Sequence, residues 1–259
     1  MKIVEKIFPP YFGWSHGAAL FLGYLFTSIV AKYGFSFGVG FLEGFLEGLL
    51  DINFSELVTA VNISHSLEIL EGIVGDVAGG IVIVVLLRFF SKKLARNLWK
   101  EIGWLPCGRS FLVGGILVGL ALSLGVLLVR YTLFSDIPRS GFMADRLNVI
   151  FWIIPSVLLA PVIEETLFRG VLYLGMRNSW GQSWAFWSVT ILYSLLHLFY
   201  FPKGKFPALF IFLVYTISGI VLLLFRMKSN SLIPSIALHC SYNVIWLFHT
   251  FSRLSPLPH

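Results

Sequence analysis

Long apolar segments dominate this 259-residue chain and restrict what it can fold into. A helix that crosses a bilayer needs about 20 mainly apolar residues. In lipid such a helix also satisfies its own backbone hydrogen bonds. The sequence therefore predicts an all-α, polytopic transmembrane helical bundle with seven spans, or eight in an alternative reading. The seven segments are residues 12–33, 67–90, 110–133, 148–175, 182–200, 206–226 and 231–251.

The composition supports a membrane protein with a single domain over residues 1–259. The chain is 57% hydrophobic and 12% charged, whereas a soluble domain has about 25% charged residues. The net charge is +6, and the basic residues cluster between the apolar segments, which suits anionic lipid headgroups. We therefore expect membrane lipids as partners and no nucleic acid.

The span count depends on the interval 34–65, which holds several acidic residues. Within it, Glu43 and Glu47 recur four residues apart, which predicts a short amphipathic or re-entrant helix over Phe41–Leu50. If residues 36–50 instead cross the membrane, the count becomes eight. The basic loop 91–109 is expected to be cytoplasmic, because cytoplasmic loops carry an excess of Lys and Arg.

Two local signals concern helix shape and packing. Gly115 and Gly119 form a small-xxx-small face, which favours close approach of another helix. Pro155 and Pro161 predict a bend or restart of the helix in the fourth segment, because proline lacks an N–H donor.

Residues 164–169 read Glu-Glu-Thr-Leu-Phe-Arg inside an apolar stretch. Each charge in that setting costs about 2.5–3.5 kcal/mol on insertion scales, so such groups pair, face a wet cavity or carry function. Glu165 and Arg169 are four apart with the acid first, the favoured pairing geometry on a helix. Glu164 is then freer to act on water.

Three helices bring polar groups to one depth. The fourth and fifth segments turn near Asn178–Gly181, with Glu164 before the turn and His197 after it. At 1.5 Å per residue both lie roughly 20–25 Å from that end. On the last segment His239 and Asn243 share a face, about 16–22 Å from the same end. The sequence therefore predicts a polar intramembrane cavity.

These side chains suit the hydrolysis of an amide. A carboxylate and an imidazole sharing a water form a general-base pair. A second imidazole and a carboxamide supply donors for an oxyanion. No Ser or Cys is placed as an obvious nucleophile, and the zinc-protease motif His-Glu-x-x-His is absent. We expect no cofactor or metal, although Glu164, His197 and His239 include zinc-ligand types and keep a metal site as an alternative.

Three short motifs resemble those of the CAAX protease and bacteriocin-processing family of intramembrane glutamate proteases. The first motif is Ala-Pro-Val-Ile-Glu-Glu-Thr-Leu-Phe-Arg-Gly at residues 160–170. The second is Tyr-Ser-Leu-Leu-His at 193–197, with Tyr193 where Phe is commonest, and the third is His-Cys-Ser-Tyr-Asn at 239–243. The resemblance covers roughly residues 148–250, in the expected order.

The resemblance implies a type II CAAX prenyl endopeptidase. Glu164 and His197 would activate water, His239 and Asn243 would stabilise the oxyanion, and Glu165 and Arg169 would support the first motif. The expected partner is a lipidated, prenylated peptide or protein that loses its C-terminal tripeptide. The expected location is a multi-pass position in the plasma membrane of a prokaryote or the endoplasmic reticulum of a eukaryote.

Other functions remain open from the sequence. The family implies processing of other membrane peptides or a non-catalytic scaffold or immunity role as alternatives. The Glu/His chain also allows a proton-coupled transporter, which the absence of a visible repeat disfavours. Three further histidines are interpreted as structural or interfacial: His16, His65 and His249. Three acidic residues are expected to line the outer end of the second segment, with a role in the cavity as the alternative: Glu68, Glu71 and Asp76.

Overall fold

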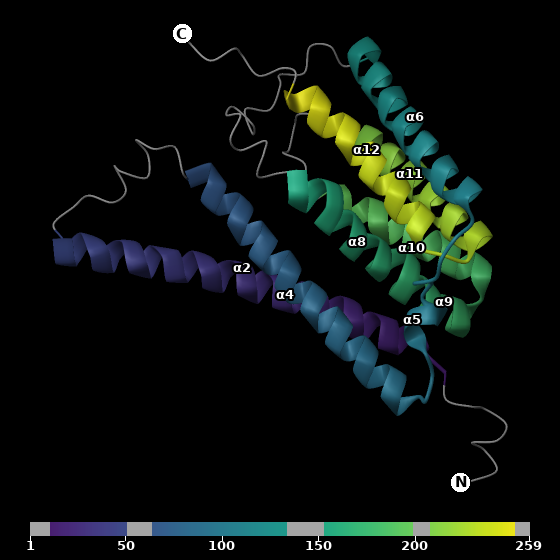
Figure 1. The fold of residues 1–259 in the computed structure, drawn as a ribbon, viewed down its shortest axis with the longest axis horizontal. Coiled ribbons are helices and arrows are strands. Elements are labelled where there is room, and N and C mark those ends of the chain that lie inside the picture. Colours follow the sequence, from purple (N-terminus) through teal and green to yellow (C-terminus); the bar gives the residue numbers. More distant parts are fainter. Residues whose placement is uncertain (1–10, 51–63, 134–152, 199–207, 252–259) are drawn as a thin grey trace.

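The computed structural model describes residues 11–50, 64–133, 153–198 and 208–251. Every regular element in these residues is helical (Figure 1). The elements are α2 (Trp14–Leu50), α4 (Ser64–Lys93), α5 (Leu98–Glu101), α6 (Arg109–Leu133), η2 (Ile154–Leu159), α8 (Ala160–Glu165), η3 (Thr166–Leu172), α9 (Tyr173–Trp180), α10 (Gln182–Leu198), α11 (Ala208–Ser229) and α12 (Ile233–Phe251).

Two long helices, α2 and α4, form an N-terminal pair that lies beside the other helices (Figure 1). The pair approaches closely at two glycines of α4. A Cβ at Gly75 would lie 2.8 Å from the carbonyl oxygen of Ser28, and one at Gly79 would overlap the Tyr24 ring and the Ser28 hydroxyl. Small residues at these points let the two backbones pack.

The predicted interruption after residue 33 is wrong. α2 continues without a break from Trp14 to Leu50, so Phe41–Leu50 is the end of one long helix and not a separate short one. The four-residue spacing of Glu43 and Glu47 suggested a short amphipathic helix, but the same spacing also occurs when the preceding helix continues. Residues 36–50, on which the eight-span alternative depends, likewise belong to this helix.

Four helices of the described residues are long and apolar enough to cross a membrane: Trp14–Phe45, Leu70–Lys93, Arg109–Leu133 and Ala208–Ser229. These helices make the chain an integral membrane protein. The three remaining predicted segments, 148–175, 182–200 and 231–251, are helical as well, although residues 148–152 and 199–200 lie outside the described residues. The count of seven or eight spans stays a prediction.

The helix that carries the acidic motif is a continuous rod from Ile154 to Trp180 with two wide π-helical stretches, η2 and η3. The prolines do not break it. In η2 the backbone N–H of Ala160 donates to the carbonyl of Pro155, five residues back, so the wider turn keeps the chain helical. π-Helical turns are frequent at functional sites.

Helices α6 and α12 pack in parallel, which confirms the prediction from the glycine pair. A Cβ at Gly115 would meet the carbonyl of Pro234, and one at Gly119 would meet Leu238 and Ser241. The same four-residue step on both helices shows that they run in the same direction. This contact places α12, with its third motif, against the bundle.

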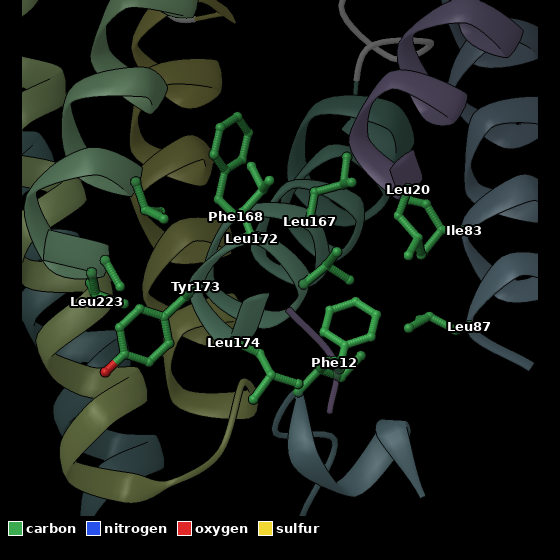
Figure 2. Close-up of a cluster of buried hydrophobic side chains, with 14 of the residues drawn as sticks. Phe12, Leu20, Ile83, Leu87, Leu167, Phe168, Leu172, Tyr173, Leu174 and Leu223 are labelled. Carbon is green, nitrogen blue, oxygen red and sulfur yellow. The ribbon is translucent and has the colours of Figure 1, made fainter. Parts of the chain in front are cut away.

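The apolar core lies on both sides of the rod, against the N-terminal pair on one side and against α10 and α11 on the other (Figure 2). Leu20 of α2, Leu87 of α4 and Val171 of η3 have no exposed surface. Each such side chain contributes about 1.5–3 kcal/mol when it replaces contact with water, and less where lipid is the alternative. The core fixes the rod, and therefore the acidic motif, relative to α2 and α4.

Candidate active site

Glu164 and Glu165 end α8 and precede the wide turn of η3, so the two carboxylates leave the rod on different sides. Glu165 points inward and its side chain is fully buried. Nη1 of Arg169, one turn later, donates to Oε1 of Glu165 at 3.0 Å, and the Arg169 side chain is 1% exposed. The predicted pairing of Glu165 with Arg169 is therefore confirmed.

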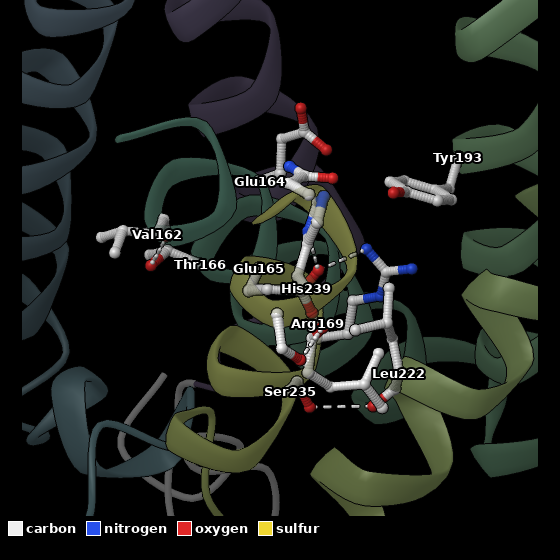
Figure 3. Close-up of polar contacts among 12 residues, drawn as sticks. Val162, Glu164, Glu165, Thr166, Arg169, Tyr193, Leu222, Ser235 and His239 are labelled. Atoms are coloured by element: carbon white, nitrogen blue, oxygen red, sulfur yellow. Dashed lines mark hydrogen bonds and ion pairs between the residues drawn. The ribbon is translucent and has the colours of Figure 1, made fainter. Parts of the chain in front are cut away.

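His239 of α12 reaches the same carboxylate (Figure 3). Its Nδ1 lies 3.0 Å from Oε1 of Glu165. Since a carboxylate accepts hydrogen bonds, Nδ1 carries a proton and donates to Glu165. One oxygen atom thus joins Arg169 of the first motif to His239 of the third.

Glu164 lies on the other side of the rod and faces His197 of α10. Its Oε2 is 3.8 Å from Nε2 of His197, which is longer than a direct hydrogen bond. A separation of this size suits a bridging water. Glu164 has a 27% exposed side chain, whereas that of Glu165 is fully buried.

The ring of His197 has a defined tautomer. Nδ1 lies 2.8 Å from the carbonyl oxygen of Tyr193, one turn earlier. A carbonyl only accepts, so Nδ1 carries the proton and Nε2 presents its lone pair toward Glu164. A hydrogen bond of this kind fixes both the tautomer and the orientation of a functional histidine.

Tyr215 of α11 completes the surroundings of His197, and the sequence did not single it out. Its ring stacks on the imidazole with centroids 4.0 Å apart and an interplanar angle of 24°. The centroid of the Tyr193 ring lies 4.3 Å from that of the imidazole, and the Arg169 guanidinium lies over the Tyr193 ring at 4.0 Å from its centroid. With nine Tyr in the chain and no motif around Tyr215, no sequence signal distinguished it.

Asn243 lies on α12 one turn after His239. Its Nδ2 donates to the carbonyl oxygen of Ser156 in η2 at 2.7 Å. A carboxamide nitrogen has two hydrogens, so this bond uses one of them. The bond ties α12 to the beginning of the rod.

The structure brings Glu164, His197, His239 and Asn243 together around one pocket of about 110 Å³. Glu165 and Arg169 do not line the pocket, but they contact residues that do: Glu165 accepts from His239, and Arg169 lies over the Tyr193 ring. The pocket is lined by Glu164, Tyr193, His197, Tyr215, Ser218, Leu222, Leu238, His239, Tyr242 and Asn243.

Other polar residues lie apart from this pocket. In the residues that the structure describes, no group of three or more His, Cys, Asp or Glu side chains is arranged to hold a metal ion. The backbone N–H of Gly13 donates to Nδ1 of His16, and His249 lies 3.0 Å from the Tyr131 hydroxyl. The side chains of His65 and Glu68 lie outside the description.

Comparison with known proteins gives one family. Residues 146–245 match the family model described as Rce1-like, type II CAAX prenyl endopeptidase. No curated protein and no solved structure matches the chain. The matched segment contains the three motifs and all of the residues that line the pocket, which confirms the resemblance. Over this segment, 100 of the 259 residues, the chain is similar to the Rce1-like type II CAAX prenyl endopeptidases.

Proposed function

We propose that the chain is an intramembrane glutamate endopeptidase that removes the C-terminal tripeptide of prenylated CAAX substrates. The observation that carries the proposal is the pairing of Glu164 with a His197 whose Nε2 lone pair is directed at it. This pair lines a pocket that also holds His239 and Asn243. The family supplies the substrate class.

Glu164 and His197 act together on one water molecule. The water lies between Oε2 of Glu164 and Nε2 of His197 and gives up a proton as its oxygen attacks the scissile carbonyl. Since Nδ1 of His197 is already bonded to Tyr193, Nε2 is the nitrogen that takes part. The rings of Tyr215 and Tyr193 both contact the imidazole ring.

His239 and Asn243 stabilise the negative oxygen that forms on the carbonyl. His239 donates to this oxygen from Nε2–H while its Nδ1–H donates a hydrogen bond to Glu165. Asn243 retains one amide hydrogen beyond the bond to Ser156.

The test of this function is product identification. Purified protein in detergent is incubated with a farnesylated CAAX peptide, and the products are separated and weighed by mass spectrometry. The proposal predicts a released tripeptide and a peptide that ends at the farnesylcysteine carboxylate. Cleavage at another bond, or equal cleavage of the peptide without its farnesyl group, would contradict the proposed substrate class.

A further inference from the structure

A third carboxylate lies in the apolar part of the fold and has no part in the chemistry described above. Asp76 is half-buried in the middle of α4, within the span Leu70–Lys93. The Tyr24 hydroxyl of α2 donates to its Oδ1 at 2.8 Å. An acidic residue inside a membrane span is costly and marks function by default.

The direction of α2 along the rod follows from two contacts. A Cβ at Gly17 would lie 3.2 Å from the carbonyl oxygen of Val171. One turn further along α2, the Phe21 ring meets the Phe168 ring edge-on, with centroids 5.8 Å apart. The residue numbers rise on α2 and fall on the rod, so the two helices are antiparallel.

The next turn in this register brings Tyr24 to the level of Glu164. Tyr24 lies three residues after Phe21, and Glu164 lies four residues before Phe168, on the same face of the rod. Figure 3 shows the Glu164 carboxylate pointing away from the Glu165–Arg169 pair, on the side where α2 passes.

Helix α4 reaches the same level of the rod. A Cβ at Gly80 would lie 3.5 Å from the Ile163 side chain, and Asp76 is one helical turn away on α4. The Tyr24–Asp76 pair therefore lies on the α2 and α4 side of the rod, at the level of Glu164.

The charge of Asp76 restricts what it can bind. A CAAX tripeptide carries a C-terminal carboxylate, which Asp76 and Glu164 would repel. The scissile nitrogen behaves in the opposite way, because it bears an N–H in the amide and becomes positive when it leaves as a protonated amine. An ionised carboxylate suits that nitrogen through a charge-assisted hydrogen bond.

We propose that Asp76, oriented by Tyr24, binds the scissile nitrogen and stabilises the leaving amine; this inference rests on the proposed function. The water oxygen bonds to the carbonyl carbon, and one water proton passes through the Glu164–His197 pair to the nitrogen. The C–N bond then breaks and its electron pair stays on nitrogen. The amine takes up the proton that the new carboxylic acid releases, and the resulting ammonium ion is the partner of Asp76.

The experiment compares two farnesylated peptides that differ only in the scissile bond, an amide in one and an ester in the other. The ester leaves as an alcohol, which gains no positive charge. Asp76→Asn lowers kcat/KM for the amide about tenfold, the scale of one charge-assisted hydrogen bond, and leaves the ester within about twofold. Tyr24→Phe has a smaller effect in the same direction. Glu71→Gln, five residues earlier on α4, changes neither substrate.

Equal losses on the amide and the ester would overturn the proposal, because a structural role moves both. Wild-type protein provides a second test that needs no variant to fold. The free tripeptide should inhibit cleavage about tenfold more strongly than its N-acetylated form, which has no ammonium group. Equal inhibition by the two forms would overturn the leaving-amine site. Failure of wild-type protein to cleave either peptide would overturn the proposed function itself.

Discussion

Nδ1 of His239 and Oε1 of Glu165 lie 3.0 Å apart, although 74 residues separate them in the chain. The same oxygen accepts from Arg169 at 3.0 Å. Glu165 therefore fixes the ring of a pocket histidine to the rod from which Glu164 reaches the pocket. The two adjacent carboxylates have different tasks because one is fully buried between two donors and the other faces the pocket.

Removal of Glu165 should destabilise the fold strongly. In Glu165→Ala the buried Arg169 loses its counter-charge, which costs about 3–5 kcal/mol in free energy of unfolding. The control is Glu101→Ala, which removes the 2.8 Å ion pair with Arg96 at positions 24% and 39% exposed. An exposed pair of that kind contributes about 0–1 kcal/mol. Denaturant unfolding followed by circular dichroism measures both, and equal small losses would contradict the assigned role of Glu165.

Tyr215 should act on catalysis through its ring and not through its hydroxyl. Tyr215→Phe retains the stacking on His197 and is expected to keep kcat within about threefold, whereas Tyr215→Leu should lower kcat about 10- to 100-fold, as expected for a misplaced catalytic group. The measurement is steady-state cleavage of the farnesylated peptide by folded variants. A large loss in Tyr215→Phe would show that the hydroxyl takes part instead.

The contact between α6 and α12 should depend on one glycine. In Gly119→Ala the new methyl group overlaps Leu238 and Ser241, which should cost about 1–3 kcal/mol in free energy of unfolding and displace the neighbouring His239. Gly125→Ala is the matched control, because a Cβ there meets nothing within 4 Å. Thermal unfolding and peptide cleavage measure the effect, and Gly119→Ala should have a lower Tm and a lower cleavage rate than Gly125→Ala. Comparable behaviour would show that α6 does not position the third motif.

Much of this arrangement follows from helical periodicity and chain length. The four-residue spacing of Glu165 and Arg169 is a local property, and the structure confirms it. Equal distances from a tight turn place Glu164 and His197 at one depth, and both line the pocket. Gly115 and Gly119 likewise indicated a close helix contact, although not which helix supplies it.

Other features depend on partners far along the chain. The bond of His239 to Glu165 and that of Asn243 to Ser156 require the packing of α12 against the rod, which no local spacing encodes. A bend or restart of the helix was expected where the structure has the wide turns of η2. Proline removes one N–H donor, but the sequence does not show which other N–H groups then bond the helix carbonyls. Helix α2 extends to Leu50 because no proline interrupts residues 34–50, although glycines recur there. The acidic residues of this interval were interpreted as a boundary.

The most direct test of the central claim measures cleavage of a fluorogenic farnesylated CAAX peptide by Glu164→Gln and His197→Ala, each with and without a chelator. The account predicts that wild-type cleavage resists the chelator. Both variants should fold and bind the peptide but lose at least about 10³-fold in kcat, the combined scale of general-base catalysis and water positioning. Glu43→Gln, an acidic position on α2 outside the pocket lining, should behave as wild type. Retained cleavage in folded Glu164→Gln, or loss of wild-type activity with the chelator, would contradict a glutamate-activated water.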